Sequence, residues 1–277
     1  MIHDISSRHR SDIHCTEKDL AMLLEKIYSD HGWDFRNYKR ASLKRRIQKR
    51  FAALDLHNCT DYCEALDSDP AEYSRLFAAL TIKVSEFFRE PEVFEMLTRT
   101  VTERFPRDAG IKAWCCGCAF GEEAYSLAMV FSETLSAEGL KLSKVFATDI
   151  DPDALDAARR AVYREDSIRN VVPDIREKYF FKVNGMHKVK YKIRNLVKFG
   201  TQDIVKSPSI SKVQVLFCRN LFIYFNKTLQ EKVFEKLDYS LVPGGILVLG
   251  KAEVLPQRFA AGYAALGEHH SVYEKKV

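Results

Sequence analysis

The sequence predicts an α/β protein in which a small N-terminal helical domain precedes a doubly wound domain with a parallel sheet. Three observations support this prediction. Residues 1–82 show helical periodicity with little strand signal, and from about residue 110 short apolar runs alternate with helical stretches. One later segment breaks that alternation with a hairpin pattern, which indicates a small antiparallel β-subdomain inserted in the main domain.

The helical domain is expected to span residues 1–82, followed by a linker over 83–95. Its first helix begins near Thr16, whose hydroxyl can cap it, and carries an apolar stripe at Leu20, Leu23, Leu24 and Ile27. A second stripe is formed by Leu43, Ile47, Phe51 and Leu54. Two further helices are predicted over 61–66 and 70–82.

The second domain is expected to span residues 96–277. Short apolar runs predict strands at 111–115, 144–148, 196–199, 213–218 and 246–250. Helices are predicted between them at 122–134, 153–162 and 229–239. The β-subdomain is placed at about 178–199, where Lys and Arg alternate with apolar residues and Asn184–Gly185 forms a hairpin turn.

Composition excludes several classes of protein. The 277 residues are 46% hydrophobic and 29% charged, with a formal net charge of +5, which is typical of a folded globular chain. No apolar run approaches the roughly 18 residues of a membrane span, and the polar stretch 1–11 lacks the apolar core of a secretory signal. The seven cysteines are therefore expected to be reduced thiols, and the protein is expected to be cytoplasmic and not membrane-inserted.

A glycine-containing turn joins the first predicted strand to the helix that follows it. Gly117 and Gly121 allow close approach of the backbone to a nucleoside. The helix opens with Glu122 and Glu123, which would repel a phosphate. A ligand with an ammonium group and no phosphate, such as S-adenosylmethionine, fits better. The alternative is a tight strand-to-helix connection with no ligand.

Polar residues follow two other predicted strands. Asp149, at the end of the second strand, is placed to accept hydrogen bonds from ribose hydroxyls, whereas Asp151 is expected to cap the next helix. The alternative makes both of them caps. Arg219 and Asn220 follow the strand at 213–218, where open sheets bind ligands. The alternative for Arg219 is a structural pair with Glu253 or Asp149.

These residues lie in five ordered blocks that resemble the CheR-type chemoreceptor glutamate methyltransferases, which are S-adenosylmethionine-dependent chemotaxis proteins. The resemblance covers most of the chain. The blocks are Ser85–Glu90, Gly117–Ser126, Ala147–Asp151, Phe217–Phe225, and Pro243–Gly245 with Gly250–Glu253. The resemblance implies a Rossmann-like methyltransferase domain that transfers methyl to glutamate side chains on the cytoplasmic helices of chemoreceptors, giving methyl esters and S-adenosylhomocysteine.

The resemblance also implies roles for individual residues. The catalytic side chains would be Arg89, Arg219 and Tyr224. The cofactor site would be formed by Ser85, Arg89, Gly117, Glu123, Asp149, Asp203, Arg219 and Asn220. No metal is expected. The chain departs from the family pattern at Phe120, Asp203, Lys251 and Ala252.

Seven of the twelve residues from Lys39 to Arg50 are basic, and no acid appears from Phe35 to Leu54. We interpret this basic helix as a surface for the acidic methylation helices of receptors, with the apolar stripe inward and the cations outward. The alternative is a basic face that is exposed to solvent and binds no partner. Nucleic acid is not expected as a partner. The short, glycine-poor β-subdomain weighs against tethering by a receptor C-terminal peptide.

Two alternative functions remain open at this point. One keeps the cofactor but changes the acceptor to another acidic protein or a small carboxylate. The other is a non-catalytic module that binds S-adenosylmethionine and regulates a partner. Zinc binding by Cys59 and Cys63 with the cysteines at 115–118 is disfavoured because the spacings are poor.

Overall fold

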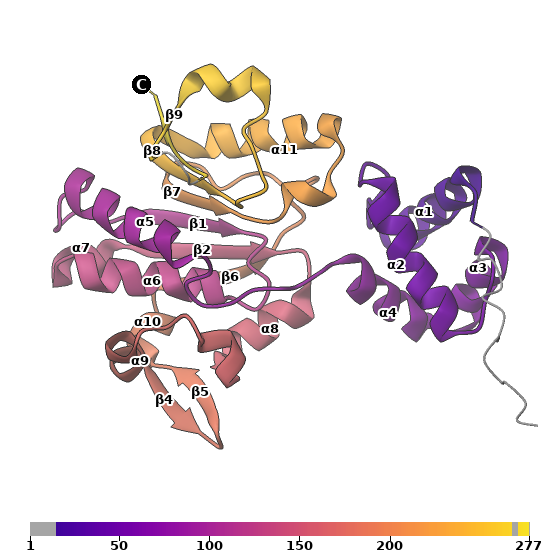
Figure 1. The fold of residues 1–277 in the computed structure, drawn as a ribbon, viewed down its shortest axis with the longest axis horizontal. Helices are drawn as coiled ribbons and strands as arrows, with labels where there is room; N and C mark the ends of the chain where they lie inside the picture. The colour runs from indigo at the N-terminus through magenta and orange to yellow at the C-terminus, as the bar shows by residue number, and fades with distance from the viewer. Residues whose placement is uncertain (1–14, 268–270, 277) are drawn as a thin grey trace, which may run out of the picture. The chain divides into compact units, whose positions relative to one another are not determined.

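The computed structural model describes residues 15–267 and 271–276, and it confirms the predicted fold class (Figure 1). The chain divides into two compact units. The helical unit comprises Met1–Ile82 together with Tyr224–Asn226, and the α/β unit comprises Lys83–Ile223 and Lys227–Val277. The polar start of the chain, interpreted above as lacking a signal, lies outside the described residues. No helix within the described ranges is long and apolar enough to cross a membrane.

The helical unit contains α1 (Glu17–His31), α2 (Arg40–Ala53), α3 (Cys59–Ser68) and α4 (Pro70–Leu80). Thr16 caps α1 in a reciprocal capping box with Asp19, which satisfies two backbone N–H groups at once. The predicted stripe of α1 is fully buried, and Leu43, Ile47 and Phe51 of α2 are buried with it. Leu54, which was expected in the same stripe, is 38% exposed, because α2 ends before it.

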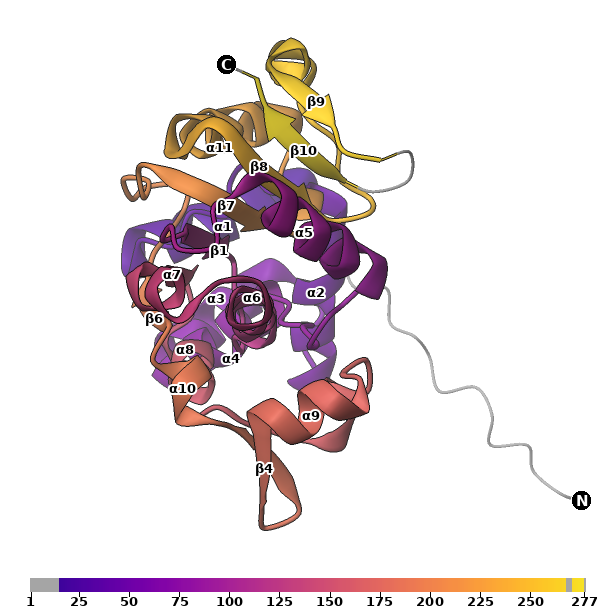
Figure 2. The same ribbon diagram turned by 90° about the vertical axis from the view of Figure 1, so that its left-hand side faces the viewer.

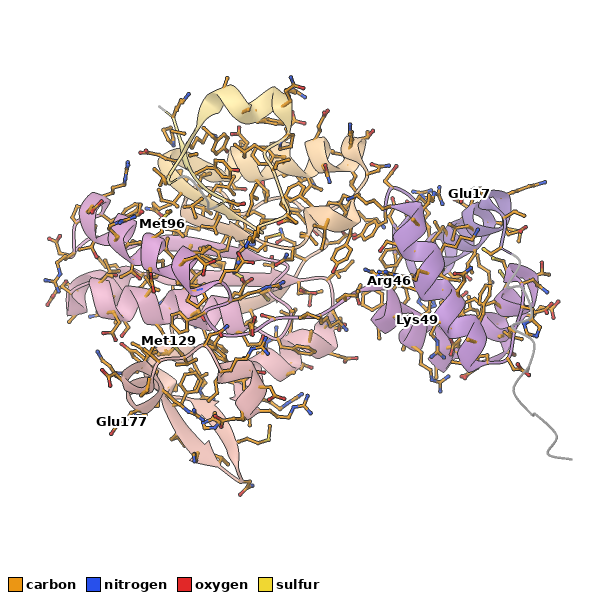
Figure 3. All side chains as sticks on the ribbon, in the orientation of Figure 1. Glu17, Arg46, Lys49, Met96, Met129 and Glu177 are labelled. Carbon is orange, nitrogen blue, oxygen red and sulfur yellow. The ribbon has the colours of Figure 1, made fainter. Side chains whose placement is uncertain are left out.

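The structure corrects the prediction that the cations of α2 all face outward. Arg46 is only 5% exposed, and its guanidinium donates to the carbonyl of Leu80. Arg50 binds the buried Glu72 through Nε and Nη2, each at 2.8 Å. Both arginines lie three residues after a member of the apolar stripe, so the helix turns them toward the core side. Among the basic residues of this segment, Lys39, Arg45 and Lys49 are exposed, and Figure 3 labels Arg46 and Lys49 on α2.

The α/β unit is built on a seven-stranded sheet of order β6-β2-β1-β7-β8-β10-β9. The first five strands in this order pair in parallel, and β10 runs antiparallel to both β8 and β9. The strands are β1 (Lys112–Cys116), β2 (Lys144–Asp149), β6 (Val197–Thr201), β7 (Val213–Cys218), β8 (Leu241–Leu249), β9 (Tyr263–Ala265) and β10 (Val272–Lys275). The core strands β1 and β7 are almost completely buried, as parallel strands covered on both faces should be.

Helices cover the two faces of this sheet. Two of them, α6 (Glu122–Thr134) and α8 (Pro152–Arg160), pack on β2 and β6, and α5 (Pro91–Arg104) packs on α6. Helix α11 (Lys227–Ser240) packs on β8 and lies on the opposite side of the sheet from α6 in Figures 1 and 2. The segment expected as a linker, 83–95, therefore contains the first turn of α5. Short helices complete the unit: α7 (Ala137–Leu142), α9 (Pro173–Tyr179), α10 (Tyr191–Arg194) and the 3-10 turns Glu165–Ile168, Phe222–Tyr224 and Gln257–Gly262.

The small antiparallel sheet is present, with different limits from the predicted 178–199. It has the order β3-β5-β4, formed by β3 (Val162–Tyr163), β4 (Phe180–Val183) and β5 (Met186–Val189). Asn184 and Gly185 both have positive φ and form the two-residue turn between β4 and β5. The last residues of the predicted segment belong instead to β6 of the main sheet.

The order of the strands marks the point of the sheet where a ligand is expected. From β1 the chain proceeds outward to β2 and β6 on one side, and β7 and β8 continue on the other side. The strand order therefore reverses between β1 and β7. In open α/β sheets, ligands bind outside the carboxyl ends of the strands at such a point. The loops that follow β1 and β7 contain the glycine turn and Arg219.

Candidate functional site

The glycine loop is held against the end of β2 by its backbone. The N–H groups of Gly117 and Cys118 both donate to the carbonyl of Thr148, at 2.8 and 3.0 Å. Gly117 has φ +70°, a conformation that side chains disfavour. Gly121 also has a positive φ, +88°, and an added Cβ there would lie 2.9 Å from Ala158 and from the ring of Phe199. Gly121 is thus needed for packing of the loop on α8 and β6, and Gly117 for the shape of the turn.

Asp149 joins this loop to the end of β2. Its Oδ2 accepts from the N–H of Ala119 at 2.8 Å, and its Oδ1 accepts from the N–H of Asp151 at 3.0 Å. Asp151, in turn, caps α8 by accepting from Asp153 and Ala154. Asp149 is therefore not a helix cap. Burial raises its pKa even though both backbone bonds oppose the shift.

The two carboxylates that open α6 are both buried, and they face different surroundings. Burial raises the pKa of Glu122 to about 7, and the nearby Ser85 hydroxyl only partly opposes the shift. Within residues 15–267 and 271–276, Glu122 Oε2 and Ser85 Oγ have no aligned hydrogen bond. Burial also raises the pKa of Glu123, against the opposing effect of Arg219 and Arg89. The first turn of α6 therefore holds two carboxylates whose burial is incompletely compensated.

Arg219 lies at the centre of a buried charge cluster. Its side chain is 0% exposed and pairs with Glu123 through Nη1 and with Glu90 through Nη2, 2.7 Å from Glu90 Oε2. Nη1 also donates to the carbonyl of Arg89 at 3.1 Å. Burial lowers the pKa of Arg219, but the two carboxylates outweigh it and the net shift is upward. The alternative partners named from the sequence, Glu253 and Asp149, are wrong: the partners are two other glutamates.

This cluster leaves polar atoms unpaired. Within the described part of the chain, Arg219 Nε is buried without a hydrogen-bond partner, and Nη2 reaches Glu90 as an ion pair without hydrogen-bond alignment. Two carboxylates face the guanidinium of Arg219, and the nearby cation of Arg89 also acts on Glu123, where it opposes the rise in pKa. The unpaired guanidinium N–H groups favour a ligand with a hydrogen-bond acceptor, and the buried carboxylate of Glu123 favours a ligand with a positively charged group.

Four non-glycine residues around the site have a left-handed backbone. They are Phe88 (φ +49°), Glu90 (φ +58°), Ala119 (φ +46°) and Asn220 (φ +58°). Such conformations cost about 1–3 kcal/mol each and persist only where the surroundings impose them. They occur in all three loops that converge here, after β1, after β7 and before α5.

Glu253 is a site residue to which the sequence reasoning assigned no functional role. It is 4% exposed, and its Oε2 accepts from the N–H groups of Asn220 at 2.8 Å and Gly250 at 2.7 Å. Its Oε1 accepts from the N–H of Ile223 at 3.3 Å. The carboxylate thereby holds the loop after β7 in the shape that presents Arg219. The available signal was its place in the block Gly250–Glu253 of the family resemblance.

The remaining predicted residues of the α/β unit have more local contacts. The half-buried Arg89 donates from Nη1 to the carbonyl of Val84 at 3.2 Å. The motif 85–90 is fixed to α6 because the N–H of Phe88 donates to Ser126 Oγ at 3.0 Å. Asp203 Oδ1 accepts from the N–H of Val205 at 2.9 Å, which closes a turn after β6.

Tyr224 belongs to the helical unit, whereas the other predicted site residues belong to the α/β unit. Its carbonyl accepts from the N–H of Lys39 at 2.8 Å, and the guanidinium of Arg46 lies 4.7 Å from its ring centroid. These contacts explain why Arg46 is buried. They also place Tyr224 against the basic helix of its own unit.

The cysteines form two separate groups. Cys59 and Cys63 lie in the helical unit, and Cys115, Cys116 and Cys118 lie in the α/β unit. Burial raises the pKa of the Cys115 and Cys118 thiols, which makes them poor nucleophiles. Over the described ranges, no group of three or more His, Cys, Asp or Glu side chains has an arrangement that could hold a metal ion.

The site fits S-adenosylmethionine by its donors and acceptors. Asp149 holds carboxylate oxygens beside the glycine loop, and Glu123 supplies a buried carboxylate that an ammonium group would suit. The glycine loop leads into carboxylates rather than into a phosphate-binding helix terminus. A sheet of this order, with a glycine turn after β1, is the architecture of a Rossmann-like methyltransferase, and the acidic residues at its strand ends suit S-adenosylmethionine.

Comparison with known proteins gives the family. Residues 83–265 match the family model described as CheR methyltransferase, SAM binding domain, and residues 18–81 match CheR methyltransferase, all-alpha domain. The chain therefore belongs to the CheR methyltransferase family, as the resemblance of its motifs predicted.

Three relatives are similar to this chain in sequence over most of their length. A Pseudomonas putida protein provisionally named methyltransferase Cher3 is 34% identical over 247 residues, covering 86% of this chain and 89% of that protein. The chemotaxis protein methyltransferase of Escherichia coli K12 is 30% identical, with 82% and 81% covered. Chemotaxis protein methyltransferase 2 of Pseudomonas aeruginosa is 28% identical, with 87% and 88% covered.

Proposed function

We propose that this protein is a cytoplasmic protein-glutamate O-methyltransferase that methylates glutamate side chains of chemoreceptor cytoplasmic domains. The observation that carries the proposal is the buried cluster of Arg219 with Glu90 and Glu123, beside the glycine loop. Its buried Glu123 carboxylate matches the ammonium group of S-adenosylmethionine. Membership in the CheR family, with relatives named as chemotaxis methyltransferases, supports the receptor as acceptor.

We propose the following cofactor contacts for this site. Asp149 would receive the ribose hydroxyls, since its oxygens lie beside the glycine loop. Glu123 would hold the ammonium group, while Gly117 allows the loop to pass close to the methionine portion. Ser85, whose buried hydroxyl has no aligned hydrogen bond and lies near Glu122, would contact the methionine portion. Asp203 and Asn220 would border the nucleoside.

The chemistry needs little more than orientation. S-adenosylmethionine, when bound, supplies a methyl group that is already activated on a sulfonium. A glutamate acceptor is ionised at neutral pH, so this chain does not have to supply a general base. Arg89 would direct one carboxylate oxygen of the acceptor, and Tyr224 would hydrogen-bond or confine the other. Holding the acceptor and excluding water are then the main catalytic contributions.

The exposed cations of the basic helix would attract the acidic acceptor. Lys39, Arg45 and Lys49 are exposed on the helical unit, whereas Arg46 and Arg50 are occupied by structural contacts. Receptor methylation helices carry rows of glutamates, so complementary charge would raise the association rate and suppress other partners. The docking surface is thus narrower than the seven basic residues of the sequence imply.

A methylation assay tests this function. The protein would be incubated with methyl-labelled S-adenosylmethionine and a receptor cytoplasmic fragment, and methyl esters would be measured as methanol released by alkali. We expect alkali-labile label on glutamates, and none on a fragment whose methylation-site glutamates are changed to glutamine. Asp149→Ala should abolish labelling, whereas Asp156→Ala, an exposed change on α8, should not. Alkali-stable label, or label on the glutamine fragment, would contradict the proposal.

A further inference from the structure

We propose that Glu90 is a positioning residue that keeps Arg219 paired when Glu123 turns to the ammonium group of the methyl donor. The inference rests on the proposed function, because it assumes that the donor is S-adenosylmethionine. The sequence analysis placed Glu90 in the block Ser85–Glu90 but gave its carboxylate no role.

The geometry of Arg219 calls for two carboxylates. The guanidinium is completely buried, and removal of the only partner of a buried charge is strongly unfavourable. It bridges Glu123, on the first turn of α6, and Glu90, directly before α5. When a ligand ammonium group competes for Glu123, Glu90 is the carboxylate of this chain that stays paired with Arg219.

The backbone of Glu90 supports a specific placement. Its φ of +58° and ψ of 74° are unusual for glutamate, and its side chain makes no capping hydrogen bond to α5. The side chain is used for the Arg219 contact instead, at 2.7 Å. The neighbouring Arg89 carbonyl also accepts from Arg219. The strained segment thus presents two acceptors to the same guanidinium.

This arrangement has a consequence for affinity. With Glu90 neutral, Glu123 becomes the sole carboxylate on Arg219, and the ion pair between them tightens. Binding of an ammonium group to Glu123 must then disrupt that pair. Replacement of Glu90 by a neutral residue should therefore lower the affinity for ligands that carry the amino-acid portion. The affinity for the nucleoside alone should not change.

The test compares S-adenosylhomocysteine, which carries the ammonium group, with 5′-methylthioadenosine, which lacks the amino-acid portion. Kd values would be measured by calorimetry, directly or by competition, for wild type and Glu90→Gln. We expect Glu90→Gln to raise the Kd for S-adenosylhomocysteine by about tenfold or more, equivalent to about 1.4 kcal/mol of binding free energy. Methylthioadenosine should bind within about twofold of wild type.

Three other variants make the test decisive. Glu92→Gln removes an exposed charge from the first turn of α5 and should leave both ligands unaffected. Glu90→Gly removes the carboxylate where a glycine backbone is favourable, so it should fold even if Glu90→Gln does not, and it should show the same selective loss. Glu90→Asp should recover most of the affinity for S-adenosylhomocysteine.

Equal weakening of both ligands would overturn the positioning role, since it would indicate general damage to the site. Unchanged binding of S-adenosylhomocysteine in both Glu90→Gln and Glu90→Gly would overturn it as well. Failure of the wild type to bind either ligand would instead overturn the proposed function, and with it this inference.

Discussion

The two units of this protein each bury an arginine–glutamate assembly, and the two assemblies are built differently. In the helical unit, Glu72 is 1% exposed and accepts from Arg50 twice, from Tyr62 and from Arg75. In the α/β unit, Arg219 is surrounded by two carboxylates and retains an unpaired buried Nε. The first assembly satisfies its charges from within the chain, and the second does not.

The carboxylates reflect this difference in the direction of their pKa shifts. For Glu72, burial raises the pKa, but its hydrogen bonds to Arg50 and Tyr62 outweigh burial and lower it overall. For Glu123 and Asp149, burial dominates and the pKa is raised. In the structural pair, hydrogen bonds and opposite charges fully offset the effect of burial on the carboxylate. In the candidate ligand site they offset it only in part.

The largest effect is expected from breaking the satisfied pair. Glu72→Gln leaves Arg50 without its buried counter-charge and should lower the free energy of unfolding by about 3–5 kcal/mol. Because the pKa of Glu72 is lowered by folding, its contribution is present above its unfolded pKa and is lost as pH falls through the folded value. The difference from wild type should therefore shrink below about pH 4. Urea unfolding of wild type and Glu72→Gln at pH 7 and pH 3.5 measures the difference in the free energy of unfolding at each pH.

The exposed Glu64→Gln on α3 is the control for this change and should alter stability by less than about 0.5 kcal/mol. If Glu72→Gln lost no more than Glu64→Gln, the helical-unit pair would not be the structural element described above.

Glu122 offers the opposite pH dependence. Its folded pKa of about 7 lies above the ordinary 4.5, so the native state binds the proton more tightly than the unfolded state does. Stability from this group is present at low pH and is lost as pH rises between about 4.5 and 7. Glu122→Gln should remove that loss and raise the free energy of unfolding at pH 8 by up to about 3 kcal/mol.

The measurement is urea unfolding of wild type and Glu122→Gln at pH 5 and pH 8. Glu138→Gln, an exposed first-turn glutamate of α7, is the matched control and should preserve the pH dependence of wild type. A variant Glu122→Gln with wild-type pH dependence would show that this carboxylate does not titrate as its burial indicates.

Substitution of Arg89 should affect catalysis more than cofactor binding. Arg89→Ala should lower kcat by on the order of 100-fold, the usual effect of removing one group that acts in the transition state. The Kd for S-adenosylmethionine should rise by a smaller factor, less than about tenfold, because Arg89 borders the cofactor site but its main proposed role is to direct the acceptor. Exposed Arg99→Ala on α5 serves as control. A fall in cofactor affinity with kcat unchanged would refute the assigned role.

The smallest effect concerns the basic helix. Replacing exposed Arg45 and Lys49 together by Glu should raise the KM for receptor by about three- to tenfold at low salt, with little effect on stability. The same exchange at Arg46 should destabilise the helical unit, since that side chain is buried against Tyr224. Lys18→Glu on α1 is the surface control. An unchanged KM for the double variant would remove the basic helix from the docking surface.

The sequence predicted the strands and turns that form the site, because each depends on local patterns. Gly117, Asp149 and Arg219 all lie at the ends of apolar runs, and strand ends converge in a parallel sheet. Pro91 was an unused signal for the start of α5, since proline favours the first helical turn. The short strands β3, β9 and β10 carry too few residues for a periodicity to show.

Long-range pairing was beyond sequence reasoning. Arg219 and Glu90 are 129 positions apart, and no local pattern connects them. The burial of Arg46 and Arg50 was more accessible, because both lie on the same helical face as Leu43 and Ile47. Reading them only as charges, without their helical positions, produced the wrong expectation.

The central claim is that incomplete compensation at Glu123 marks the cofactor site, whereas complete compensation at Glu72 does not. Calorimetric titration of S-adenosylhomocysteine into wild type, Glu123→Gln and Glu72→Gln tests this most directly, at a temperature where all three are folded. We predict that Glu123→Gln binds at least about 30-fold more weakly than wild type, while Glu72→Gln binds with the Kd of wild type. Wild-type affinity in Glu123→Gln, or an equal loss in both variants, would contradict the claim.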